Sequence, residues 1–499
     1  MARKQVKEFG RDSTWYFLNT LINAGLGMVA VPLLTKKALS PGEYGIYSLV
    51  VTTILFLSSV LAHWIAGSVM RFYAEYSKKG ELEKLYSTVF RFVPVIAGGL
   101  LLLVPLIAFV LPLGEYRMMI IFASAVFVGT SITTITLGFL LAKQASSLYA
   151  LTQLLESFGR FALGAILVLS LGFGPEGLFL GWLIGIIAAL AIQFKVLSLR
   201  SNCHKRNYSR SLLNELWKYG WPIALIQIMV YLLSFSDRYM IQIMRDPFEV
   251  GLYSAVYTIT TQVFGVTMGF FFSSARPIVL KTWEHEGEEA TIRLIRLLTR
   301  FFLLVVVPAG VGFFLVRERV LLLFTTSEYL PAESAVLPLV MGFSAHFLVR
   351  IPNMAYSIRK KTRRLSSMIL YSTLLNIGLN LVMIPRWGID GAAWATFIAY
   401  AFYLVINTYD GNRLLRWSFP WLSLFKVAAA VTVMGVPIFF LEKVLAPGAL
   451  SLVLLMLAGV AVYSVMLLVL REPGWHEIKE MSRIMVSRLA RLLPRASME

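Results

Sequence analysis

Charged residues, acidic residues and cysteine are all scarce in this sequence. Charged residues make up 15% of the 499 residues and hydrophobic residues make up 58%, whereas a soluble globular protein has about 25% and about 45–50%. The apolar excess runs along the whole chain, and this excludes a soluble enzyme. The single cysteine, Cys203, excludes an internal disulfide framework and a cysteine-rich metal site.

Motifs of catalysis and of ATP use are also missing. The chain has no G-x-x-x-x-G-K-[ST] phosphate loop, no H-E-x-x-H helix and no serine nucleophile elbow. Its five histidines are scattered and have no metal-ligand spacing. We therefore expect a protein that is not an enzyme, has no cofactor or metal, and uses an ion gradient, the membrane potential or the substrate gradient.

What the sequence does contain is a series of long apolar runs. A membrane-spanning helix needs about 20 mostly apolar residues, and about fourteen stretches of this kind occur. Because strand edges and irregular backbone are not stable in lipid, we expect an all-α polytopic membrane protein. The predicted spans are 13–34, 44–70, 86–112, 117–141, 146–171, 177–198, 218–240, 250–272, 294–316, 335–357, 365–385, 389–409, 421–441 and 450–470.

The basic residues predict the orientation of these spans. One set of alternate loops, with both termini, holds 32 Lys and Arg residues, and the other set holds 9. Because basic loops stay in the cytoplasm, we expect both termini to be cytoplasmic and the protein to lie in the cytoplasmic (inner) membrane. This signal explains most of the net charge of +19 without nucleic acid. The nine Lys and Arg residues in the other set of loops, on the predicted outer side, are Lys36, Lys37, Arg117, Arg238, Arg245, Arg317, Arg319, Arg386 and Lys443.

Two pairs of short segments repeat along the chain. Residues 41–48 (PGEYGIYS) share five identities with residues 247–254 (PFEVGLYS), and residues 174–177 (GPEG) match residues 388–391 (GIDG). Each pair joins equivalent spans, which predicts two parallel six-helix lobes around a central cavity, as in many secondary transporters. The predicted domains are an N-terminal lobe (1–212), a C-terminal lobe (213–412), two additional transmembrane helices (413–470) and a cytoplasmic basic amphipathic tail (471–499).

Five basic residues remain inside the predicted spans, where a charge is costly and marks a candidate functional residue. Arg91, Arg300 and Lys426 lie near cytoplasmic ends, where snorkelling to the headgroups explains them. Arg160 follows Glu156 by one helical turn. The two either pair to stabilise the bundle, or Glu156 releases Arg160 to an anionic substrate.

Arg350 has no acidic residue nearby in sequence, which favours a cavity role. Guanidinium groups bind phosphate oxygens bidentately, so a cavity lined by arginines favours phosphate or pyrophosphate groups. Asp237 and Arg238 are candidates for a gate or an interfacial pair. The candidate substrate-binding residues are Arg160, Arg350, Arg91 and Glu156, and the aromatic residues Trp15, Tyr16 and Trp221 either stack on sugars or belong to interface belts.

Several segments resemble polysaccharide flippases of the multidrug/oligosaccharidyl-lipid/polysaccharide (MOP) exporter superfamily. They are VPLLTKKALSPGEYGIYSLV (31–50), RFY (71–73), SDRYMIQ (236–242) and NIGLNLVMIPRWGIDGAAWATFIAY (376–400). The resemblance implies a monomeric flippase that moves a polyprenyl-pyrophosphate-linked oligosaccharide (an O-antigen, exopolysaccharide or capsule repeat unit) to the outer leaflet by alternating access. It also implies contact with membrane lipids and coupling to Na+ or H+.

Other classes stay open at this point. A peptidoglycan lipid-linked precursor flippase is poorly separated by sequence, and a cation-coupled drug antiporter needs buried carboxylates, for which Glu156 is the best candidate. The loop after the second span, RFYAEYSKKGELEKLY, lacks the G-x-x-x-D-R-x-G-R pattern of the major facilitator class. A membrane glycan polymerase or ligase usually has a large outside loop, whereas no predicted outside loop exceeds roughly 18 residues.

Overall fold

The computed structural model describes residues 19, 21–23, 25–91 and 116–472. This described part is helical throughout and contains no β-strand. Ten of its helices are long and apolar enough to cross a membrane, so the predicted all-α polytopic membrane fold is confirmed. Most of the predicted span 86–112 and nearly all of the predicted tail 471–499 lie outside the described residues.

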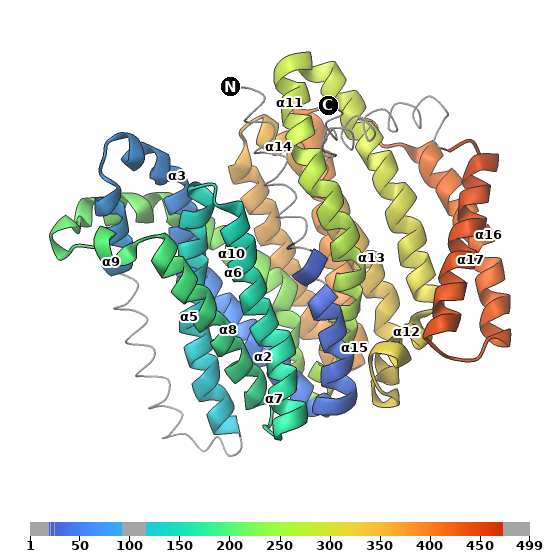
Figure 1. Cartoon of the computed structure of the whole chain (residues 1–499). Coiled ribbons are helices and arrows are strands. Elements are labelled where there is room, and N and C mark those ends of the chain that lie inside the picture. Colours follow the sequence, from blue (N-terminus) through green and yellow to red (C-terminus); the bar gives the residue numbers. More distant parts are fainter. Residues whose placement is uncertain (1–18, 20, 24, 92–115, 473–499) are drawn as a thin grey trace, which may run out of the picture.

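The helices follow one another with short connections (Figure 1). They are η1 (Leu34–Ala38), α2 (Pro41–Ser58), η2 (Ser59–His63), α3 (Trp64–Lys78), α5 (Arg117–Ala142), α6 (Ser146–Phe158), η4 (Gly159–Leu163), α7 (Gly164–Leu171), α8 (Glu176–Val196), α9 (Leu199–Asn202), η5 (Lys205–Asn207), α10 (Arg210–Met244), α11 (Pro247–Leu315), α12 (Arg317–Phe324), η6 (Ser327–Ala335), α13 (Val336–Leu348), α14 (Asn353–Ile358), α15 (Thr362–Leu414), α16 (Trp421–Val444) and α17 (Ala449–Val469). The turns η1, η2 and η4 are π-helical, and η5 and η6 are 3-10 turns.

Two of these helices each contain two predicted spans. The chain bends inside α11 at Gly287, with φ 84°, and inside α15 at Gly388, with φ 54°. A positive φ favours glycine, which has no Cβ atom to clash. Figure 1 shows α11 running up to this bend and back down again.

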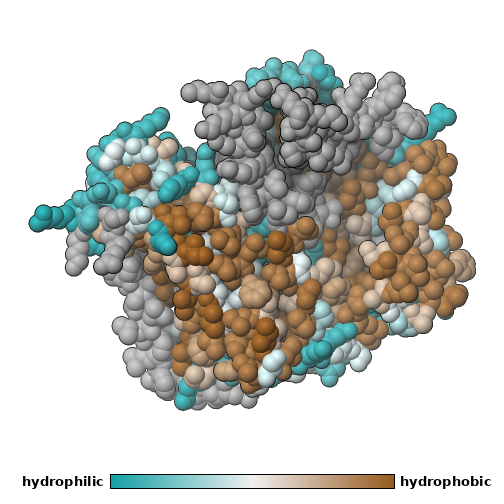
Figure 2. All heavy atoms as spheres, in the orientation of Figure 1, coloured by the Kyte–Doolittle hydropathy of each residue, from teal (hydrophilic) through white to brown (hydrophobic). Residues whose placement is uncertain are grey.

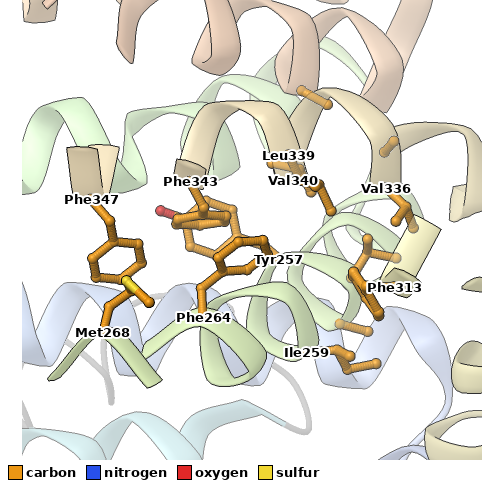
Figure 3. Close-up of a cluster of buried hydrophobic side chains, with 14 of the residues drawn as sticks. Tyr257, Ile259, Phe264, Met268, Phe313, Val336, Leu339, Val340, Phe343 and Phe347 are labelled. Carbon is orange, nitrogen blue, oxygen red and sulfur yellow. The ribbon is translucent and has the colours of Figure 1, made fainter. Parts of the chain in front are cut away.

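Apolar side chains cover the middle of the surface. Figure 2 shows a broad brown band with teal residues gathered toward its edges, and Met456 and Leu457 in the middle of α17 are 58% and 60% exposed. Lipid chains are as apolar as leucine, so helices in lipid associate through close van der Waals packing and polar bonds. Inside the molecule, Phe264 and Met268 of α11 lie against Phe343 and Phe347 of α13 (Figure 3).

The helices α2 and α11 begin at the two repeated segments, and they begin in the same way. Ser40 caps α2 by accepting a hydrogen bond from the Glu43 amide, and Asp246 caps α11 by accepting one from the Glu249 amide at 2.8 Å. Each helix then has proline at its first position, where the missing N–H costs nothing.

These two helix starts pack directly against each other. A Cβ atom on Gly45 would lie 2.0 Å from the carbonyl oxygen of Pro247, and one on Gly251 would lie 1.8 Å from the carbonyl oxygen of Pro41. Each repeat therefore places its glycine against the proline of the other, as a local twofold axis requires. This reciprocity supports the two six-helix lobes (1–212 and 213–412), which remain a prediction.

The helix pair α16–α17 is held at both of its ends. At one end, Arg319 of α12 donates hydrogen bonds to the Leu445 carbonyl at 2.8 Å and to the Ser451 hydroxyl at 3.2 Å. At the other end, the side chain of Glu472 is only 2% exposed and forms ion pairs with Arg300 of α11 and, at 3.4 Å, with Lys426 of α16. The pair therefore stays attached to α11 and α12.

Burial alone raises the pKa of Glu472, but hydrogen bonds from Arg300 and Ser423 and the charge of Lys426 outweigh it and lower the pKa below 4.5. Because the folded-state pKa is lowered, Glu472 stabilises the fold at neutral pH. This contribution is lost as the pH falls through the lowered pKa.

We expect Gly45→Ala to destabilise the crossing of α2 and α11 by about 1–3 kcal/mol, because the new methyl group overlaps backbone that cannot move aside locally. Thermal unfolding of the purified protein measures this effect. Gly42→Ala is the matched control, since a Cβ atom at Gly42 has nothing within 4 Å. Equal melting temperatures for the two variants would contradict the close crossing.

We expect Glu472→Gln to lower the free energy of unfolding by about 1–3 kcal/mol at neutral pH, because two cations lose their carboxylate partner. The difference from the wild type should shrink well below pH 4.5, where Glu472 itself becomes protonated. Glu289→Gln is the control, because its pair with Arg293 is exposed and contributes little. A pH-independent difference would show that the charge of Glu472 is not responsible.

Candidate substrate-binding site

Arg160 lies where the π-helical turn η4 interrupts the helix formed by α6 and α7. Turns of this kind occur frequently at functional sites. Gly159 lets the turn approach α8 closely, because a Cβ atom there would lie 2.6 Å from the carbonyl oxygen of Gly181. The residues that follow these two glycines are therefore in contact. The guanidinium carbon of Arg160 lies 4.3 Å from the ring centroid of Trp182.

Glu156 bonds to Trp182 and not to Arg160. Its Oε1 accepts a hydrogen bond from Trp182 Nε1 at 3.1 Å, and its Oε2 lies 3.5 Å from the hydroxyl of Thr133. No ion pair joins Glu156 to Arg160, so the first of the two alternatives, a pair one helical turn apart, is not formed. The physical reason is the π-helical turn, which begins at Gly159 and shifts Arg160 from its α-helical register.

Arg160 is thus held by aromatic rings. Its guanidinium carbon lies 4.9 Å from the Phe161 ring centroid as well, and its Nε has no hydrogen-bond partner among the described residues. A cation–π contact holds the charge without using the N–H donors. The guanidinium fork therefore keeps its capacity to bind a phosphate oxygen pair.

Polar residues of the first helix extend this cluster. Asn23 donates a hydrogen bond to the Asn19 side chain at 2.8 Å, and Ser157, beside Glu156, donates one to Asn23. Sequence reasoning missed these residues, although asparagine within a membrane span is itself a signal of an interhelical bond. Nearby, a Cβ atom on Gly27 would lie 2.6 Å from Gln262 of α11, so the first helix meets α11 here.

Arg350 lies two residues beyond the end of α13 and is exposed, although it lies within a predicted span. Its guanidinium carbon lies 4.9 Å from the Phe347 ring centroid and 5.6 Å from that of Phe272. Like Arg160, it forms no ion pair with a carboxylate of residues 25–91 or 116–472. A cation that lies within a membrane span needs water or an anion beside it.

Asp237 and Arg238 are both buried, at 1% and 4% exposure, and their side chains turn to different partners. Asp237 accepts a hydrogen bond from Tyr253 at 2.5 Å and lies 3.5 Å from the Thr396 hydroxyl, whereas Arg238 donates to Ser254 at 3.1 Å. The two side chains form no ion pair with each other. Sequence reasoning missed both new partners in α11, although Tyr253 and Ser254 end the repeated segment.

The remaining sequence candidates lie elsewhere. The guanidinium carbon of Arg91 lies 5.1 Å from the Tyr208 ring centroid, beside the loop before α10. Trp221 is 39% exposed and stacks on Trp217 at 4.9 Å. Trp15 and Tyr16 lie outside the described residues.

Arg300 and Lys426 share Glu472 as an ion-pair partner. The contacts of Arg160 and Arg350 are instead aromatic rings, with no carboxylate partner among the described residues.

Comparison with known proteins identifies the family. The sequence profile of the polysaccharide biosynthesis protein family matches residues 9–283. A probable low-salt glycan biosynthesis flippase of Haloferax volcanii is 26% identical over 254 residues, which are 49% of this chain and 51% of that protein. The match thus spans about half the length of this curated relative.

Solved structures share the fold at low sequence identity. A lipid II flippase MurJ in an inward closed conformation has a TM-score of 0.74 and 16% identity, and the alignment covers 91% of this chain and 98% of that one. An inward-facing multidrug resistance MATE transporter of the MOP superfamily has a TM-score of 0.64 and 15% identity, covering 79% and 94%. The fold is MurJ/MATE-like, and the chain belongs to the polysaccharide biosynthesis protein family.

Proposed function

We propose that this protein is a flippase that moves a polyprenyl-pyrophosphate-linked oligosaccharide from the cytoplasmic to the outer leaflet of the cytoplasmic membrane. Membership of the polysaccharide biosynthesis family and the similarity to a glycan flippase support this class of substrate. The observation that carries the proposal is the pair Arg160 and Arg350, two cations at membrane depth whose contacts are aromatic rings and not carboxylates.

Pyrophosphate suits such a pair of residues. Each guanidinium forms two parallel hydrogen bonds to phosphate oxygens, and each bond to a charged group is worth about 1.5–3 kcal/mol. Because the cytoplasm is the negative side, the membrane potential favours outward movement of an anion. Each net negative charge that crosses lowers its free energy by about 2.3 kcal/mol per 100 mV.

We assign separate roles to the other candidates. Glu156 orients Trp182, which in turn holds Arg160. Arg91, near the predicted cytoplasmic end of its span, attracts the anion toward the cavity. Asp237 is the group at which Na+ or H+ couples to transport, because it is a fully buried carboxylate surrounded by hydroxyl donors.

A peptidoglycan precursor flippase is the second candidate function, favoured by the TM-score of 0.74 to a lipid II flippase. Its substrate shares the lipid pyrophosphate, so the same arginines serve both functions. Reconstituted proteoliposomes separate the two. The protein is supplied with lipid-linked oligosaccharides of several kinds or with lipid II, and glycan exposure on the far leaflet is measured.

Translocation of an oligosaccharide but not of lipid II supports the proposal, and no translocation above empty liposomes for any oligosaccharide overturns it. Imposing a Na+ gradient, a pH gradient or a membrane potential on the same vesicles identifies the driving force. If neither ion gradient changes the rate, the coupling role assigned to Asp237 is wrong.

We expect Arg160→Gln and Arg350→Gln each to reduce translocation about tenfold or more, because each removes a charge-assisted bond to pyrophosphate. Arg293→Gln is the control, since Arg293 is 74% exposed and pairs only with an exposed glutamate among the described residues. Wild-type rates in either variant at equal protein amount would remove that arginine from the site.

Substitutions of Trp182 test how Arg160 is held. Trp182→Phe keeps an aromatic face for the guanidinium but loses the N–H bond to Glu156, whereas Trp182→Leu loses both. We expect the wild type to bind substrate most tightly, Trp182→Phe less tightly and Trp182→Leu most weakly. The total loss from wild type to Trp182→Leu should be about twofold to thirtyfold, because a cation–π contact is worth about 0.5–2 kcal/mol. Combined with Arg160→Gln, either substitution should have no further effect. If a Trp182 substitution lowers substrate affinity as much in the Arg160→Gln protein as in the wild type, Trp182 acts independently of Arg160.

A further inference from the structure

The turn η1 forms contacts with the distant helix α12. The Lys36 ammonium donates a hydrogen bond to the Leu322 carbonyl at 2.7 Å, and the Thr35 hydroxyl lies 2.8 Å from the Phe324 carbonyl. The partners are 286 and 289 residues apart in sequence. The contacts therefore join the predicted N-terminal lobe (1–212) to the predicted C-terminal lobe (213–412).

Both carbonyls belong to the last turn of α12, which ends at Phe324. The last four carbonyls of a helix have no partner within the helix and carry its partial negative charge. A lysine at this position satisfies one of these carbonyls and complements the charge. Lys36 is also one of the nine basic residues on the predicted outer side, where the topology signal does not explain a lysine.

The contact lies close in sequence to the crossing of the two repeats. Lys36 is followed within five residues by Pro41, whose carbonyl packs against Gly251 of α11. The lobes thus touch at the start of α2 in two ways. The glycine crossing gives close shape complementarity, and the cap of α12 gives directed polar bonds.

We propose that Thr35 and Lys36 form a latch that holds the outer side of the transporter closed by capping α12. This inference rests on alternating access in the proposed function. When the lobes separate on the outer side, the latch opens, and the reverse movement restores the cap.

The chemistry of the latch allows it to open and close. The Thr35 hydroxyl has one hydrogen and lies 2.9 Å from the Val31 carbonyl of its own helix, so it has a second acceptor when Phe324 moves away. The Lys36 side chain is exposed and gains water on release. Leu322 and Phe324 are only partly buried, so water can reach their carbonyls as well.

Spin labels on the outer side of each lobe test this proposal without any substrate. The labels are placed at Phe173→Cys and Arg386→Cys in a Cys203→Ser background, and the distance distribution is measured by double electron–electron resonance in lipid nanodiscs. We expect Lys36→Ala with Thr35→Val to increase the ratio of the longer to the shorter distance by about tenfold. Lys37→Ala is the matched control, because Lys37 is an exposed neighbour with no partner among the described residues.

Lys36→Arg, which keeps the charge and the donors, should retain the closed distribution. If the distributions of the wild type, the double variant and Lys37→Ala coincide, the latch does not exist. Because these measurements need no glycan, they judge the latch even if the proposed substrate proves wrong.

A covalent lock supplies a second measurement that does not depend on the stability of the double variant. Lys36→Cys and Leu322→Cys are joined by a cleavable bismaleimide in proteoliposomes that contain whichever lipid-linked oligosaccharide the wild type translocates. We expect the cross-link to stop translocation and its cleavage to restore the rate. Translocation at the uncross-linked rate with the link intact would overturn the proposal.

Discussion

A charge inside a bilayer has to find a partner, reach an interface or face water, because lipid offers it no solvation. This constraint organises the structure. Glu472 forms ion pairs with both Arg300 and Lys426 and thereby holds α16 and α17 against α11. Arg160 and Arg350 have aromatic neighbours and no carboxylate partner among the described residues. In the proposed function, the pyrophosphate group of the substrate is the partner of these two charges.

Close backbone packing provides the second constraint, since helices in lipid gain little from burying apolar surface. Glycines permit both crossings on which the account depends. Gly45 and Gly251 bring the two repeats together, and Gly159 and Gly181 bring Arg160 onto the ring of Trp182. The first crossing joins the predicted lobes, and the second places Arg160 where the proposed function needs a cation.

The membrane fold followed from the apolar runs, and the positions of Arg160 and Arg350 within spans could be read directly. The contacts around these two arginines could not be predicted from the sequence. The pairing of Glu156 with Arg160 assumed an uninterrupted α-helix, and a π-helical turn depends on packing between helices that the sequence does not display. Likewise, Glu472 lies beyond the last predicted span, so only the folded chain shows that it pairs with two cations distant in sequence.

The proposed function requires Arg160 and Arg350 to bind a pyrophosphate anion. Equilibrium binding to the purified protein in nanodiscs, with polyprenyl pyrophosphate and polyprenyl monophosphate as probes, is the decisive measurement. We expect the pyrophosphate to bind more tightly to the wild type, and this preference to be lost when both arginines are replaced by glutamine. An unchanged preference in the doubly substituted protein would contradict the account.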